Sequence, residues 1–370
     1  MMQTANDMRA LTAEVTADMR RLLAPLGRRI RIMEVCGTHT VAIFRAGLRQ
    51  ILPEEIELVS GPGCPVCVTH DAYIDAAIAY AGQEDVVVTT FGDMLKVPGS
   101  TSSLAAAQAA GADVRVVYSP LDALAVAEAH PDKKVVFLAV GFETTAPTEA
   151  AAVLAAEQKG LSNFFLLSAQ KLVPPVMRAL LNDPAAQVDA FLLPGHVAVV
   201  TGTRLFDFLA ADYRVPGVVG GFRPDEILRA LHMIVRQLAA GEARVENAYG
   251  SVVRPEGNPA AQEAVERVYE PADTAWRGLG MIPASGLRMR KEYAAYDFAV
   301  ARPLSLADVP DGRRGCRCGE VLRGKIVPKD CGLFGRACVP EHAVGPCMVS
   351  VEGTCAAWYK YGGGRFRYGA

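Results

Sequence analysis

The chain lacks the features that would commit it to a membrane or to a nucleic acid. No charge-free apolar run reaches the roughly 18 residues that cross a bilayer. The first 29 residues mix acidic and basic side chains among apolar ones, so we expect no secretory signal. The 38 basic and 40 acidic residues give a net charge of −2, which provides no attraction to nucleic acid. We therefore expect a cytoplasmic protein that binds neither a membrane nor a nucleic acid.

Cysteine is absent from the long stretch between residues 67 and 316, although the chain has nine cysteines. They form two groups, which are Cys36, Cys64 and Cys67 near the start and Cys316, Cys318, Cys331, Cys338, Cys347 and Cys355 near the end. Packing an ordinary core does not require this partition. Because structural disulfides are uncommon in the cytosol, the two groups indicate metal ligands or redox thiols.

Short β-branched runs alternate with alanine-rich helical stretches over the first two thirds of the chain. Residues 31–35, 56–59, 85–88 and 114–117 resemble strands, and the pattern is repeated from residue 134 onward. This alternation predicts an α/β fold with two Rossmann-like parallel-sheet domains that face a central cleft. The predicted segments are 1–29 for an N-terminal helix packing on the C-terminal domain, 30–125 and 126–241 for the α/β domains, and 242–370 for a loop-rich C-terminal domain.

Glycine and a polar or sulfur-bearing residue follow almost every predicted strand. Open parallel sheets bind ligands at the carboxyl ends of their strands, so these residues are candidates for a site. The candidates are Cys36, His39, Cys64, Cys67, Asp93, Glu143 and His196. The Cys-x-x-Cys pair, flanked by Gly-Pro-Gly, resembles a redox dithiol, although half of a zinc site stays open. Single residues of these types are also often caps, and a lone cysteine often only packs.

The last four cysteines follow the spacing C-x6-C-x8-C-x7-C from Cys331 to Cys355. Four thiolates suit either a tetrahedral zinc ion or a 4Fe-4S cluster. The close cysteine pairs of zinc ribbons are missing, and the intervals contain many glycines, so the spacing favours the cluster. Cys316 and Cys318 are then surplus, either as a further redox pair or as neighbours of the cluster.

The motifs at these positions together resemble one family, HypD, whose members are maturation factors of nickel–iron hydrogenases. The resemblance covers nearly the whole chain and rests on long motifs rather than on single residues. The motifs are Cys36-Gly37-Thr38-His39-Thr40, Gly61-Pro62-Gly63-Cys64-Pro65-Val66-Cys67, Phe91-Gly92-Asp93-Met94, Gly141-Phe142-Glu143-Thr144-Thr145, Pro194-Gly195-His196, Cys316-Arg317-Cys318-Gly319 and Glu352-Gly353-Thr354-Cys355.

The resemblance implies an assembly scaffold rather than a conventional turnover enzyme. With a HypC-type chaperone, such a protein assembles an iron that carries two cyanides and one carbon monoxide, the Fe(CN)2CO unit. Cyanide comes from a HypE-type protein, and the finished fragment passes to the hydrogenase large subunit. Low-spin iron(II) with these ligands favours thiolates, so Cys36 is the candidate ligand, and His39 could hydrogen-bond or protonate a bound diatomic.

The resemblance also implies roles for the remaining candidate residues. A 4Fe-4S cluster on Cys331, Cys338, Cys347 and Cys355 would recharge the Cys64–Cys67 dithiol one electron at a time. The cluster would make the C-terminal region an iron–sulfur domain. Asp93 and Glu143 would lie near Cys36 in the cleft. Cys316, Cys318, His196 and Glu352 are secondary candidates.

Two other classes of protein stay open. One is a ferredoxin-linked thiol–disulfide oxidoreductase with Cys64 and Cys67 as its dithiol, which leaves Cys36 and the acidic strand-end residues without a role. The other is a zinc-stabilised binding module in which the C-terminal cysteines are structural. Iron–sulfur colour in the anaerobically purified protein separates the zinc module from the other two.

Overall fold

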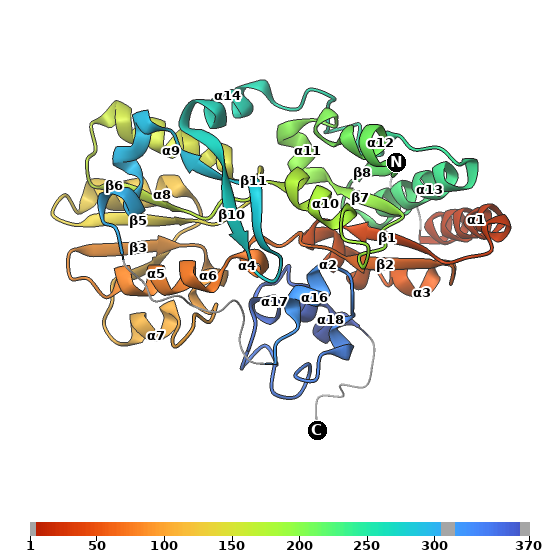
Figure 1. Ribbon diagram of the computed structural model, residues 1–370, viewed down its shortest axis with the longest axis horizontal. Coiled ribbons are helices and arrows are strands. Elements are labelled where there is room, and N and C mark those ends of the chain that lie inside the picture. Colours follow the sequence, from red (N-terminus) through yellow and green to blue (C-terminus); the bar gives the residue numbers. More distant parts are fainter. Residues whose placement is uncertain (1–4, 305–314, 363–370) are drawn as a thin grey trace.

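A computed structural model describes residues 5–304 and 315–362 of the chain. Two parallel sheets lie side by side, and a small helical segment lies beneath their junction in the view of Figure 1. In spatial order, the first sheet consists of β2 (Ile56–Ser60), β1 (Ile30–Glu34), β7 (Ala190–Pro194), β8 (Gly217–Gly220) and β9 (Val245–Asn247). The second consists of β4 (Val114–Val116), β3 (Val86–Thr90), β5 (Lys134–Ala139) and β6 (Phe164–Ser168). The predicted α/β class with parallel sheets is confirmed.

Helices cover both faces of each sheet, because successive residues of a strand point to opposite sides and the central strands are apolar on both. Ile32 and Leu192 face one core of the first sheet, whereas their neighbours Met33 and Phe191 face the other. Around the first sheet lie α1 (Ala5–Leu23), α2 (Gly37–Arg45), α3 (Leu48–Ile51), α10 (Val173–Leu181), α11 (Gly195–Thr201), α12 (Phe208–Tyr213) and α13 (Pro224–Ala240). Around the second lie α5 (Asp71–Ala81), α6 (Gly92–Leu95), α7 (Leu104–Ala109), α8 (Pro120–Ala129) and α9 (Ala146–Lys159).

The remaining elements connect the two units. They are α4 (Pro65–Val68), α14 (Pro259–Val268), the antiparallel hairpin of β10 (Tyr269–Trp276) and β11 (Gly280–Met289), α15 (Phe298–Ala301), α16 (Cys318–Leu322), α17 (Pro346–Val349) and α18 (Thr354–Tyr361). Four 3-10 turns complete the described part of the chain, at Ala24–Leu26, Arg204–Phe206, Lys291–Tyr296 and Pro328–Asp330.

The sheets are not built from the consecutive segments 30–125 and 126–241 that the sequence predicted. β1 pairs with β7, so residues 30–60 share a sheet with residues 190–247, and the second sheet is formed from residues 86–168 between them. The predicted strands themselves are present. Their hydrophobic pattern defines each strand but carries no information about its neighbour, which is why the division was wrong.

The N-terminal helix packs on α13 of the first unit and not on the C-terminal segment as predicted. Met19 and Leu23 are buried in one core with Leu231, and His232 on α13 lies 2.7 Å from the Asp18 carboxylate. The apolar stripe of α1 therefore completes the outer layer of the first sheet.

Residues 242–304 also depart from the predicted C-terminal domain, because they distribute over both α/β units. β9 extends the first sheet, α14 packs on α9 of the second unit, and β11 packs on α10. The C-terminal unit is therefore smaller than expected and comprises residues 315–362 of the described chain.

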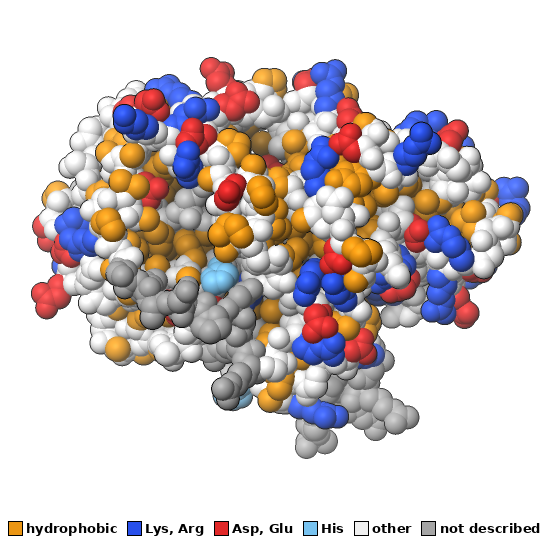
Figure 2. All heavy atoms as spheres, in the orientation of Figure 1, with side chains coloured by type: hydrophobic (Ala, Val, Ile, Leu, Met, Phe, Trp, Pro, Cys, Tyr) orange, Lys and Arg blue, Asp and Glu red, His pale blue; other side chains and the backbone are white. Residues whose placement is uncertain are grey.

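Among the described residues, no helix is long and apolar enough to cross a membrane. On the face shown in Figure 2, basic and acidic side chains are interspersed rather than gathered into a field of one sign.

A buried carboxyl lies between the second sheet and the β10–β11 hairpin. Glu149 on α9 is fully buried and accepts hydrogen bonds from Gln170 Nε2 (2.7 Å) and from the Tyr269 hydroxyl (3.5 Å). Burial raises the pKa of this carboxyl to about 8, although the two hydrogen bonds oppose the shift. The folded protein therefore keeps Glu149 protonated at neutral pH.

Replacing Glu149 with Gln should stabilise the protein at pH 8 and have little effect at pH 4.5. Above pH 4.5 the unfolded chain releases this proton, whereas the folded chain holds it until about pH 8, so the free energy of unfolding falls across this window. The amide cannot ionise, and we expect a gain on the order of 2 kcal/mol at pH 8. Urea denaturation at both pH values measures it, with Glu157→Gln on the exposed side of α9 as the control. Identical pH profiles for Glu149→Gln and the wild type would contradict the assignment.

Candidate functional site

Cys36 lies in the turn between β1 and α2, and the glycine turn after β2 packs directly against it. The Gly37 N–H donates a hydrogen bond to the Gly63 carbonyl at 2.9 Å. A Cβ added to Gly63 would come within 2.3 Å of the Cys36 nitrogen, so only glycine fits this approach. The turn that precedes Cys64 is therefore held against Cys36.

The Cys36 thiol is protonated at neutral pH. Burial raises the pKa of the thiol to about 11, and the Glu352 carboxylate acts in the same direction, while the N–H groups of His39 and Thr38 at the start of α2 favour the thiolate. The Thr38 hydroxyl donates to Glu352 Oε1 at 2.6 Å, which holds this carboxylate beside α2. A metal that binds Cys36 would have to replace the thiol proton.

The start of α2 is fixed by a buried carboxylate at the end of β1. Glu34 is fully buried and accepts hydrogen bonds from the Thr40 hydroxyl and from Arg49 Nη2, the latter at 2.6 Å. Because a buried charge is stable only when it is paired, this network holds the helix that carries Cys36 and His39 in place.

Two predicted site histidines stack on a phenylalanine that was not among the predicted site residues. The ring of Phe222, which follows β8, stacks on His39 at 4.6 Å and on His196 at 3.9 Å. Burial lowers the pKa of His39 to about 4, so its ring is neutral at physiological pH. This disfavours the expected role of His39 as a proton donor and favours a role as an acceptor. The position of Phe222 after a strand end was an available signal.

Asp93 and Glu143 belong to the second unit and have different surroundings. The Asp93 carboxylate accepts hydrogen bonds from Ser350 Oγ (3.0 Å) and Val351 N–H (3.2 Å), so it holds the loop that carries Glu352. Glu143 Oε1 accepts the Val173 N–H at 2.8 Å, and burial raises the pKa of this carboxyl to about 7. Glu143 is thus hydrogen-bonded to the start of α10. Asp93 is linked to Cys36 only indirectly, through the loop that carries Glu352.

Cys64 and Cys67 form a disulfide at the start of α4, with a Cα–Cα distance of 5.3 Å. Both are buried in the core cluster that also contains Cys318 and Cys347. The helix α4 packs on α17, which carries Cys347. The disulfide therefore lies between Cys36 on one side and the C-terminal cysteines on the other.

All six C-terminal cysteines line one small cavity in the unit formed by residues 315–362. These are Cys316, Cys318, Cys331, Cys338, Cys347 and Cys355. The Cys318 thiol interacts with those of Cys316 and Cys347, and the Cys347 thiol also interacts with that of Cys355. No group of three or more His, Cys, Asp or Glu side chains in the described part of the chain has the arrangement of a single-ion site. The four predicted ligands are thus gathered with the two surplus cysteines.

The tip of the β10–β11 hairpin lies between α4 and α16 and carries a buried ion pair that no pattern in the sequence indicates. Arg277 pairs with Asp71, both side chains being almost fully buried, and the Arg277 N–H donates to the Val68 carbonyl at 2.8 Å. A Cβ on Gly278 would lie 2.3 Å from Gly319, so the hairpin contacts the backbone beside Cys318. The hairpin therefore joins the disulfide helix to the cysteine cavity.

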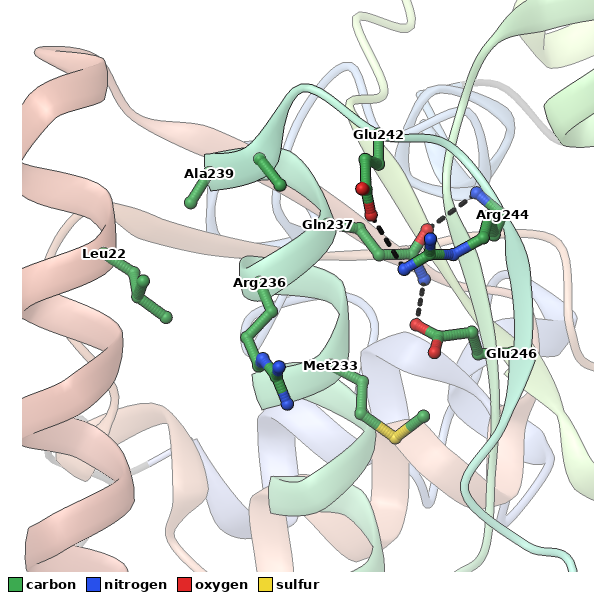
Figure 3. Close-up of a pocket in the computed structure, with 9 residues that line it drawn as sticks. Leu22, Met233, Arg236, Gln237, Ala239, Glu242, Arg244 and Glu246 are labelled. Carbon is green, nitrogen blue, oxygen red and sulfur yellow. Dashed lines mark hydrogen bonds and ion pairs between the residues drawn. The ribbon is translucent and has the colours of Figure 1, made fainter.

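A cavity of about 680 Å³ between α1, α13 and β9 holds none of the predicted site residues. Its polar side chains pair with one another, as Figure 3 shows: Gln237 donates to Glu246 at 2.6 Å, and Arg244 forms an ion pair with Glu242 at 2.7 Å. We therefore assign the functional site to the cysteine-bearing junction.

The chain is similar to known proteins over nearly its whole length. The sequence profile of HypD, described as "Hydrogenase formation hypA family", matches residues 8–362. The chain is 45% identical over 375 residues to a hydrogenase maturation factor HypD of Rhodobacter capsulatus, covering 98% of this chain and 99% of that protein. It is 47% identical over 336 residues to HypD of Escherichia coli (90% of each chain) and 42% identical over 360 residues to HypD of Cupriavidus necator (95% and 94%).

Replacing Glu352 with Gln should lower the pKa of the Cys36 thiol, because a negative charge that opposes the thiolate is removed. The alkylation rate of Cys36 against pH, followed by mass spectrometry, should rise at lower pH in the variant than in the wild type. Glu341→Gln, in the same cavity as Glu352, is the control and should leave the profile unchanged. Superimposable profiles for Glu352→Gln and the wild type would show that the carboxylate does not act on Cys36.

Proposed function

The chain belongs to the HypD family of hydrogenase maturation factors, and from this premise we propose that it is a scaffold on which, with a HypC-type chaperone, the Fe(CN)2CO unit is assembled. The observation that carries the proposal is that the segments bearing three thiol centres pack against one another at the junction of the two units. Cys36 touches the turn before Cys64, and the disulfide helix packs on the helix of Cys347. A HypE-type protein would supply cyanide, and the hydrogenase large subunit would receive the product.

The six-cysteine cavity fits a 4Fe-4S cluster better than a single ion. Thiolates are the donors that iron–sulfur clusters use, and the close cysteine pairs of zinc ribbons are missing from Cys331 to Cys355. When bound, the cluster would supply electrons one at a time. Cys331, Cys338 and Cys355 line the cavity from separate segments. The cysteine spacing predicts Cys347 as the fourth ligand. Cys316 lines the same cavity and is an equal candidate for that position.

Two of the six cysteines connect the cavity to the disulfide. Cys347 and Cys318 are the two most deeply buried of the six, and they share a core cluster with Cys64 and Cys67. Reduction of the Cys64–Cys67 disulfide takes two electrons and two protons and yields two thiols. We infer that electrons reach the disulfide through its contact with Cys318 and Cys347. The resulting dithiol is then an electron donor beside Cys36.

Cys36 is the proposed ligand of the iron that the scaffold carries. A buried thiol with a high pKa is a poor nucleophile at neutral pH, but it becomes a strong donor once iron(II) replaces its proton. The start of α2 directs the N–H groups of Thr38 and His39 to the sulfur, and the negative charge of Glu352 acts on it. A partner thiolate from the chaperone would complete the sulfur ligands.

Alanine variants of the C-terminal cysteines test the cluster and its fourth ligand. Loss of Cys331, Cys338 or Cys355 should abolish the iron–sulfur absorption of the anaerobically purified protein. The pair Cys347→Ala and Cys316→Ala decides the fourth ligand, because only the true ligand should be needed for iron content. Full iron and sulfide content in all five variants would reject the cluster in this cavity.

Thiol trapping tests the dithiol. Under reducing conditions both Cys64 and Cys67 should be alkylated, and after mild oxidation neither should be, since they lie close enough to form a disulfide. The expected difference is two thiols, mapped by peptide mass spectrometry. If both remain alkylatable after oxidation, the redox role is wrong.

Replacing Cys36 with Ser, which barely changes volume, separates the scaffold from a thiol oxidoreductase. In the complex with the chaperone, the variant should lose the infrared stretches of bound cyanide and carbon monoxide but keep its iron–sulfur absorption. A thiol oxidoreductase that works through Cys64 and Cys67 needs no Cys36. Bands of full intensity from Cys36→Ser would remove Cys36 as the iron ligand.

A further inference from the structure

Three loops at the carboxyl edge of the first sheet meet around the Phe222 ring. Phe222 follows β8, His39 lies in the first turn of α2 after β1, and His196 begins α11 after β7. The ring planes are nearly parallel, at 26° between Phe222 and His39 and 24° between Phe222 and His196. Both imidazoles therefore stack on the one Phe222 ring.

The position of the Phe222 ring is set by contacts that do not involve the histidines. The Phe222 N–H donates to Glu226 Oε2 at 3.0 Å, and the edge of the Tyr249 ring meets the Phe222 ring at 6.1 Å and 89°. A Cβ on Gly195 would lie 3.2 Å from the Phe222 ring, so glycine leaves the room that the ring occupies. Phe222 is therefore a fixed surface against which His39 and His196 pack.

The same turn also fixes the tautomer of His39. His39 Nε2 lies 2.9 Å from the carbonyl oxygen of Gly221, the residue before Phe222. A carbonyl only accepts hydrogen bonds, so Nε2 must carry the proton, and Nδ1 carries the lone pair. Nδ1 is buried and has no hydrogen-bond partner in the described chain. Leaving a buried acceptor unpaired is costly, which points to an incoming partner at this atom.

We propose that Phe222 is a positioning residue, which holds the His39 ring in the plane where Nε2 donates to the Gly221 carbonyl, so that Nδ1 of His39 is a fixed acceptor in the first turn of α2, three residues from Cys36. The first half concerns the protein without cargo. The second half, that Nδ1 accepts a hydrogen bond from or coordinates what Cys36 carries, rests on the proposed function. A purely packing role for Phe222 would not select the tautomer of a neighbouring ring.

The ¹⁵N chemical shifts of the His39 ring nitrogens show directly which tautomer is present. The chain has six histidines, so ¹⁵N-histidine labelling gives few signals, and His39→Gln assigns the one of interest. In the wild-type protein His39 should show two well-separated nitrogen shifts with the proton on Nε2. In Phe222→Leu the two shifts should move toward each other as the ring samples both tautomers. Phe222→Tyr, which keeps an aromatic ring, should restore the separation.

The matched control is Phe208→Leu, the same change at an aromatic residue of the same unit whose ring meets Tyr213 edge-on instead. It should leave the His39 signals unchanged. Unaltered His39 shifts in a folded Phe222→Leu variant would overturn the proposal. If that variant does not fold, the wild type still decides, since mixed tautomers of His39 in the unsubstituted protein would also overturn it.

The infrared spectrum of the chaperone complex tests the second half separately. Phe222→Leu should retain the cyanide and carbon monoxide bands at shifted frequencies, whereas unshifted bands would end the assigned role of Nδ1. If the wild-type complex itself shows no such bands, the proposed function fails, and the tautomer result stands on its own.

Discussion

The pairing of β1 with β7 is the constraint on which the arrangement of the site depends. It places the carboxyl ends of β2, β1, β7 and β8 next to one another along one edge of the first sheet. The loops after these four strands carry Cys64 and Cys67, Cys36, His196 and Phe222 in that order. The chain also leaves the first sheet through the Cys64–Cys67 loop and returns only at residue 190, so this loop is the crossover between the two units.

Because the disulfide loop is a crossover, it meets both α/β units and the C-terminal segment. Gly63 brings it against Cys36, α4 brings it against α17, and the hairpin tip with Arg277 closes the space between α4 and α16. Asp93 then reaches from the second unit to the loop of Glu352. Each contact uses backbone or buried polar groups, which tolerate little displacement. Together these contacts hold Cys36, the Cys64–Cys67 disulfide and the C-terminal cysteines next to one another in that order.

Much of the fold could be predicted from the sequence, because the β-branched runs and alanine-rich stretches define nearly every strand and helix of the two sheets. The strand order could not, since β1 and β7 are separated by more than 150 residues and hydrophobic alternation does not select a partner. Cys36, His39 and His196 were found because they follow strand ends. The Arg277–Asp71 pair was not, because an arginine in a hairpin turn is ordinarily exposed, and here only the packing of two other segments buries it.

The central claim is that the sulfur centres serve an iron fragment held on Cys36. The most direct measurement is the infrared spectrum of the wild-type chain, purified anaerobically with a HypC-type chaperone after co-expression with a HypE-type protein and isotopically labelled cyanide sources. The account predicts cyanide and carbon monoxide stretches, of which the cyanide bands move with the label. An intact complex with iron–sulfur absorption but no band in this region would contradict it.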